Sequence, residues 1–66
     1  MRDDAVNEVV MFLATGGYKG TKTIHDHIKS KGVKISRKTL LGILHTYAEP
    51  GEYVSIGGIR QKSWIM

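Results

Sequence analysis

The stretch SRKTLLGILHTYAEPG, from Ser36 to Gly51, places the strictest limit on how this chain can fold. Its apolar residues recur three or four positions apart, which is the spacing of one face of an α-helix. The residues on this face are Leu40, Ile43, Leu44 and Tyr47. Ser36 can cap the start of such a helix, and Pro50 ends it near Ala48 because proline disfavours helical dihedrals at the preceding residue. The sequence therefore predicts a short helix, buried along this apolar face, from Ser36 to about Ala48.

Two earlier segments also predict helices. The first is expected over about residues 4–15, where a Gly-Gly pair stops it, and the second ends at about Lys31. Thr21 or Thr23 can cap the second helix, and the connector at residues 18–20 has room for a residue or two of β-bridge. The apolar anchors of the two helices are Val6, Val9, Val10, Leu13, Ile24 and Ile28.

After the Pro-Gly pair the pattern changes from helical to extended. The segment EYVSIGGIRQKSWIM carries β-branched and aromatic residues on both sides of a Gly-Gly pair, which is typical of a β-hairpin. A two-residue turn at the glycines would pair Ile56 with Ile59. A longer tip would pair Tyr53 with Trp64. We favour the longer tip, because an aromatic cross-strand pair near the core contributes more than an apolar pair at an exposed end. In both registers Arg60 and Lys62 lie on or near the loop. Trp64 is expected to close the core beneath the hairpin.

Positive charge is concentrated in the middle of the chain. The net charge is +4, and residues 18–46 carry seven lysines and arginines against one acidic residue. Residues 1–17 carry one basic residue against three acidic ones. A basic segment between acidic and neutral ends favours a face that binds a polyanion. A solvated surface with extra lysines is the alternative interpretation of any single cluster.

Three short helices followed by a hairpin with a basic tip resemble the winged helix-turn-helix fold of bacterial, archaeal and phage regulators. The most specific part is VKISRKTLLGILHTYAEPGEYVS, which has a capping serine, the apolar helical face and a glycine before the first wing strand. The resemblance implies a mainly α fold with a C-terminal β-hairpin, as a single domain over residues 1–66. It also implies sequence-specific binding of double-stranded DNA by a small transcriptional regulator, with the third helix in the major groove and the hairpin, or wing, on the flanking backbone.

The resemblance places the exposed face of the third helix in the major groove and makes residues 60–62 the wing. Arg37 and Lys38 can donate to guanine, and Leu41 can meet a thymine methyl group. The N-termini of the second and third helices offer free backbone N–H groups that suit phosphates. Residues near these N-termini, Thr21 among them, are therefore candidate phosphate ligands as well. The predicted DNA contacts are Lys22, Thr23, Lys34, Ser36, Arg37, Lys38, Leu41, Gly42, His45, Arg60, Gln61 and Lys62.

The third helix also permits another use. Gly42 inside it costs about 1 kcal/mol relative to alanine, so close approach of DNA or of another helix should compensate. Leu41 and Gly42 together could instead form a spot for docking a protein, so a winged-helix protein-interaction module is the alternative function. RNA binding is a third, weaker interpretation because few aromatic residues are placed for base stacking. A homodimer through the first helix or the hairpin is also open.

Other classes of function are disfavoured. On a helix His25 and His27 lie about 200° apart and cannot converge on one ion, and the chain has no cysteine, so we expect no metal site and no cofactor. Ser36 is better explained as a cap than as a nucleophile, and we expect no enzyme. No apolar run approaches the roughly 20 residues that span a bilayer, and the N-terminus is too acidic for a signal peptide. We therefore expect no membrane partner and a cytoplasmic location, at the nucleoid or in the host cytoplasm if the source is a phage or virus.

Overall fold

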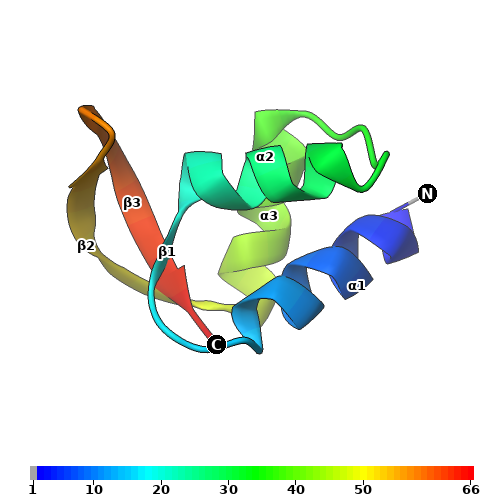
Figure 1. Cartoon of the computed structure of the whole chain (residues 1–66). Helices are drawn as coiled ribbons and strands as arrows, with labels where there is room; N and C mark the ends of the chain where they lie inside the picture. The colour runs from blue at the N-terminus through cyan, green and yellow to red at the C-terminus, as the bar shows by residue number, and fades with distance from the viewer. Residues whose placement is uncertain (1) are drawn as a thin grey trace.

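The structure, a computed structural model, describes residues 2–66 of the chain and their side chains from Asp4 onwards. Its elements are α1 (Arg2–Leu13), β1 (Lys19–Gly20), α2 (Thr21–Ser30), α3 (Arg37–Tyr47), β2 (Glu49–Ile56) and β3 (Ile59–Ile65) (Figure 1). The strands form an antiparallel sheet in the order β1-β3-β2, and the helices pack against it from one side. This arrangement is a winged-helix topology, so the predicted fold class is confirmed.

The start of α3 follows from local sequence. Ser36 occupies the N-cap position, and its hydroxyl accepts a hydrogen bond from the backbone nitrogen of Thr39 at 3.1 Å. The predicted cap is therefore confirmed. The predicted caps of α2 are wrong, because Gly20 holds that position and makes no side-chain bond there. Thr21 and Thr23 both lie inside α2.

The core lies where the three helices meet β3. Trp64 is fully buried, as predicted, and its indole nitrogen donates to the hydroxyl of Thr21 at 2.9 Å. Tyr47 was expected on the buried face of α3 but is 50% exposed, because it is the last helical residue and lies one turn beyond Leu44. The buried apolar residues are Ala5, Val9, Leu13, Ile24, Ile28, Leu40, Ile43, Leu44 and Trp64.

The hairpin adopts the register that we did not favour. Ile56 lies opposite Ile59 and Tyr53 lies opposite Lys62, so the expected pairing of Tyr53 with Trp64 is wrong. Gly57 and Gly58 have φ values of 59° and 80°, and two successive positive φ angles suit a two-residue turn. An irregularity between Pro50 and Tyr53 then shifts the register, so that Trp64 faces Pro50 at the base.

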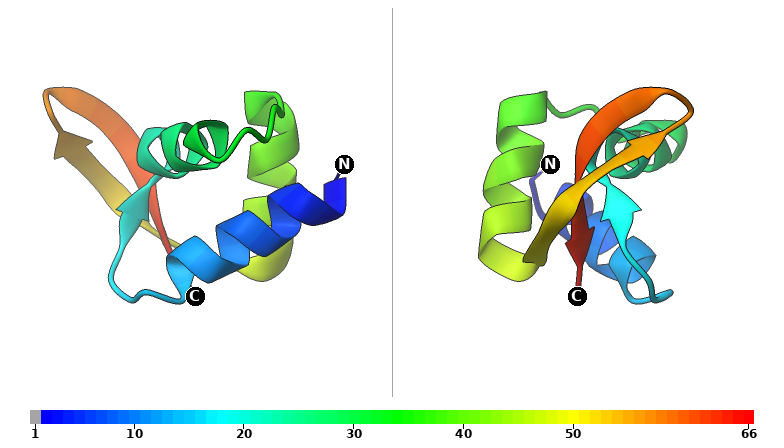
Figure 2. Two further views of the ribbon diagram at one scale, coloured as in Figure 1. Left: turned by 45° about the vertical axis from the view of Figure 1, so that its right-hand side comes forward. Right: turned by 90° about the vertical axis from the view of Figure 1, so that its left-hand side faces the viewer.

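The short strand β1 completes the sheet as the connector predicted. It places Lys19 opposite Trp64 and Gly20 opposite Ser63. The left view of Figure 2 shows the β2–β3 hairpin extending away from the helices, so its tip projects from the body of the molecule. None of the helices in the described part of the chain is long and apolar enough to cross a membrane.

Candidate nucleic-acid interface

The outer face of α3 is polar and open at most of the predicted contact positions. Arg37, Lys38, Gly42 and His45 are exposed. Leu41 departs from the prediction, because it is half-buried and packs against the core. It follows Leu40 directly and so lies at the border of the buried face, about 100° around the helix. The exposed face is therefore more polar than the sequence indicated.

Gly42 leaves bare backbone in the middle of this face. A β-carbon at this position would meet nothing within 4 Å among the described residues, apart from the backbone of the helix itself. Packing within the protein therefore does not require a glycine here. The hydroxyl of Thr46 donates to the carbonyl oxygen of Gly42 at 2.9 Å, which keeps that side chain close to its own helix.

The N-terminus of α2 is capped by a side chain from β3. The Oε1 atom of Gln61 accepts hydrogen bonds from the backbone nitrogens of Lys22 at 2.8 Å and Thr23 at 3.3 Å. Two N–H groups that were expected to be free for a phosphate are therefore occupied. Gln61 is only 5% exposed, so its prediction as an external wing contact is wrong. Sequence spacing could not reveal this pair, because Gln61 and Lys22 lie 39 positions apart in the chain.

Thr21 has a structural role as well. It is 2% exposed, its hydroxyl donates to the carbonyl oxygen of Lys62 at 2.9 Å, and it accepts the indole N–H of Trp64. Its predicted role as a phosphate ligand is therefore wrong, because both hydrogen-bonding capacities are used inside the protein. Thr23 is half-buried, Lys34 is exposed, and the hydroxyl of Ser36 is engaged in the α3 cap.

Four predicted contacts line one cleft of about 100 Å³, and three of them are cationic residues from separate elements. Lys22 comes from α2, Arg37 from the start of α3 and Arg60 from the wing, and we call this site the basic cleft. None of the described side chains that line it is acidic. The lining residues are Thr21, Lys22, His25, Arg37, Ile59, Arg60 and Gln61. Lys22 forms an ion pair with Asp26 at 3.1 Å. Both side chains are more than half exposed, so screening by solvent makes this ion pair weak. The basic cleft therefore concentrates positive charge where the wing meets both helices.

The histidines contribute packing contacts. His25 lies with its Nε2 atom 3.0 Å from the carbonyl oxygen of Ile35, which ties α2 to the turn before α3. His27 stacks on Phe12 with ring centroids 4.0 Å apart. Within residues 4–66, no three His, Asp or Glu side chains group closely enough to hold a metal ion.

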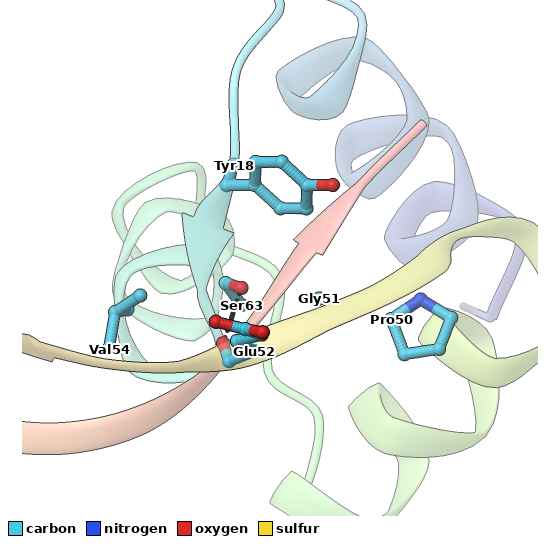
Figure 3. A pocket seen from close by; sticks show the side chains of 6 residues that line it. All are labelled: Tyr18, Pro50, Gly51, Glu52, Val54 and Ser63. Atoms are coloured by element: carbon cyan, nitrogen blue, oxygen red, sulfur yellow. Dashed lines mark hydrogen bonds between the residues drawn. The ribbon is translucent and has the colours of Figure 1, made fainter.

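A larger groove lies on the other face of the sheet. Ser63 precedes Trp64 on β3, so its side chain lies on the face of the sheet opposite the Trp64 ring. The groove encloses about 640 Å³ and is lined by Tyr18, Pro50, Gly51, Glu52, Val54 and Ser63 (Figure 3). Among the described side chains, Glu52 is the only charged one that lines the groove, and its backbone carbonyl oxygen accepts a hydrogen bond from the hydroxyl of Ser63 at 2.6 Å. A carboxylate repels phosphates, so this groove does not suit a polyanion.

The two clefts thus differ in charge and in the elements that form them. The chain matches no family model, no curated protein and no solved structure. The basic cleft and the exposed face of α3 are therefore the features from which we infer a function.

Proposed function

We propose that the protein binds double-stranded DNA sequence-specifically as a small cytoplasmic transcriptional regulator of the winged helix-turn-helix family. In this proposal α3 enters the major groove and the β2–β3 hairpin lies on the flanking backbone. The observation that carries the proposal is the convergence of Lys22, Arg37 and Arg60 around the basic cleft.

Like charges held close together raise the free energy of the free protein, and an anion between them lowers it. The cleft of about 100 Å³ is small, so a single phosphate group is the natural size of ligand. Both arginines can donate two parallel hydrogen bonds to phosphate oxygens, and Lys22 adds a point charge. We expect the basic cleft to hold one backbone phosphate and so to set the position of α3 on the duplex.

The exposed face of α3 supports insertion into the major groove. That groove is about 12 Å wide, and a helix with its side chains is about 10–12 Å across. A glycine at residue 42 narrows the helix midway along this face and lets its backbone approach the bases. Lys38 and His45 lie on either side of it and can reach base edges. The cost of Gly42 to the free helix is then offset in the complex.

The alternative is that the same face of α3 docks another protein. The sequence predicted Leu41 as the apolar residue of this docking face. In the structure Leu41 is half-buried and packs partly against the core. Less apolar surface is therefore free for a protein partner than the sequence indicated, and we prefer the DNA-binding function.

The test is binding of a duplex of about two helical turns, followed by fluorescence anisotropy at several salt concentrations. Non-specific binding already reports phosphate contacts, so no cognate sequence is needed. We expect a steep loss of affinity with salt. Lys22→Ala, Arg37→Ala and Arg60→Ala should each lower the slope of log affinity against log salt by about 1. Selection of tight binders from random duplexes then tests sequence specificity.

Lys31→Ala is the charge-matched control. Lys31 is also exposed but follows α2 at its C-terminal end, nine residues and about 13 Å along the helix from Lys22. For the Lys31→Ala variant, we expect the slope of log affinity against log salt to equal that of the parent. Salt-independent binding by the parent, or parent-like binding by Arg37→Ala, would contradict the proposal.

A further inference from the structure

A row of aromatic and cationic side chains connects the wing to α3. The guanidinium carbon of Arg60 lies 5.3 Å from the ring centre of Tyr53, and the Nζ atom of Lys62 lies 5.7 Å from it. The same Nζ atom lies 5.8 Å from the ring centre of Trp64. The Trp64 ring in turn meets the ring of His45 edge-on, with centroids 5.1 Å apart. We call this series, from Arg60 through Tyr53, Lys62 and Trp64 to His45, the wing row.

The hairpin register determines which face carries the wing row. Tyr53 lies directly opposite Lys62, and Arg60 is its diagonal neighbour. Residues two apart on a strand share a face, so Arg60 and Lys62 lie on the same face as Trp64. Because Trp64 packs among the helices, this is the face that α3 covers at the base of the hairpin. Towards the tip, the hairpin leaves the helices and the face opens to solvent (Figure 2).

Tyr53 is the unexpected member of the row. Its side chain is 59% exposed, although the face that it shares with Trp64 is buried farther down. An exposed aromatic ring that already carries two cations attracts phosphates and offers an apolar surface to the sugars between them. His45, at the other end of the row, belongs to the exposed face of α3.

We infer that Tyr53 is an additional DNA-contacting residue, and that the wing row is a site for the sugar–phosphate backbone. This inference rests on the proposed function and names the wing's ligand. The ring of Tyr53 packs against a deoxyribose, while Arg60 and Lys62, held over the ring, contact the phosphates on its two sides. The DNA strand whose sugar–phosphate backbone borders the major groove then runs along the protein from His45 to the tip of the wing.

The competing explanation is that Tyr53 only stabilises the hairpin through its cross-strand contacts. The two explanations differ in what the ring does once DNA is added. If Tyr53 contacts the backbone, its loss weakens binding even when the variant remains fully folded. If it only supports the hairpin, a folded variant binds as the parent does.

The experiment compares Tyr53→Ile, Tyr53→Phe and Tyr18→Ile for affinity to the same duplex and for thermal unfolding. Isoleucine retains strand propensity but removes the ring, whereas phenylalanine retains the ring. We expect Tyr53→Ile to lose about tenfold in affinity, because the ring no longer packs against the deoxyribose, and Tyr53→Phe to stay within about twofold of the parent. Tyr18 is 62% exposed and lines the groove on the opposite face, so Tyr18→Ile should bind as the parent does.

A second measurement needs neither DNA nor a variant that folds. The side-chain methylene protons of Arg60 and Lys62 should resonate upfield in the parent, because the Tyr53 ring shields them. Absence of that shift overturns the inference. Parent-like affinity of a folded Tyr53→Ile also overturns it but leaves the proposed function standing. If the parent itself binds no duplex, the proposed function fails and the inference fails with it.

Discussion

Gln61 on β3 and Lys22 on α2 are joined by a hydrogen bond of 2.8 Å from the backbone nitrogen of Lys22 to the side-chain oxygen of Gln61. A helix N-terminus that lacks a local cap is thus satisfied from the wing. Lys22 and Arg60, which both line the basic cleft, are held close together because Gln61 follows Arg60 directly on β3. The cap therefore couples the fold of the wing to the geometry of the candidate interface.

Removing this cap should lower stability. Gln61→Ala leaves two partly buried N–H groups at the start of α2 without their acceptor, and we expect a loss of about 1–2 kcal/mol in the free energy of unfolding. For a domain of this size, 1 kcal/mol corresponds to about 4–8 °C in Tm, which thermal unfolding followed by circular dichroism resolves. Gln61→Glu is the control, because a carboxylate accepts the same hydrogen bonds and favours a helix N-terminus. Equal Tm values for Gln61→Ala and the parent would refute the role of the cap.

Gly20 and Gln61 should be energetically coupled. A β-carbon on Gly20 would overlap the side chain of Gln61, so Gly20→Ala must displace it and should cost about 1–3 kcal/mol. In a Gln61→Ala background the same change has the space it needs and should cost much less. Urea unfolding of the parent, both single variants and the double variant measures the coupling. Additive effects would show that the overlap is relieved elsewhere.

The hydroxyl of Thr21 should be essential beneath the wing. Thr21→Val conserves shape but leaves the indole N–H of Trp64 and the carbonyl of Lys62 without this partner, and we expect a loss of about 1–3 kcal/mol. Thr21→Ser keeps the hydroxyl and should lose less. Hydrogen exchange of the indole N–H, which should become faster only in the valine variant, checks the mechanism alongside the unfolding curves.

Gly42→Ala should separate stability from DNA binding. Alanine has a higher helix propensity, and its β-carbon has open space, so the free protein should gain up to about 1 kcal/mol. If α3 lies close to the bases at this point, the added methyl group should weaken binding while leaving the salt slope unchanged, since no charge is lost. A variant that is more stable and binds DNA with undiminished affinity would argue against close approach at Gly42.

A charge reversal on the wing distinguishes DNA binding from docking of a protein on α3. Lys62→Glu places a negative charge in the wing row, where a DNA backbone should be repelled. We expect a loss of duplex affinity that is largest at low salt, whereas a protein contact through α3 should be largely retained. Lys62→Gln, which removes the charge without reversing it, should lie between the parent and Lys62→Glu in the same salt series.

Several elements of this structure were predictable because their causes are local. The helical face of Leu40, Ile43 and Leu44, the Ser36 cap and the hairpin glycines act over a few residues, and each appears in the structure. The hairpin register was predictable only in outline. The two-residue turn, and not a cross-strand aromatic pair, sets the register, because Gly57 and Gly58 both adopt the positive φ values that such a turn needs.

The sequence by itself determined the order of the elements, the winged-helix class and the concentration of positive charge in residues 18–46. Only the tertiary structure decided which polar groups remain free. Gln61 and Thr21 look like surface residues in the sequence, yet hydrogen bonds across about 40 positions bury both of them. Tyr53 looks like a core residue, yet it stands exposed between two cations. Periodicity reports the face of an element, whereas burial depends on what that face meets once the chain has closed on itself.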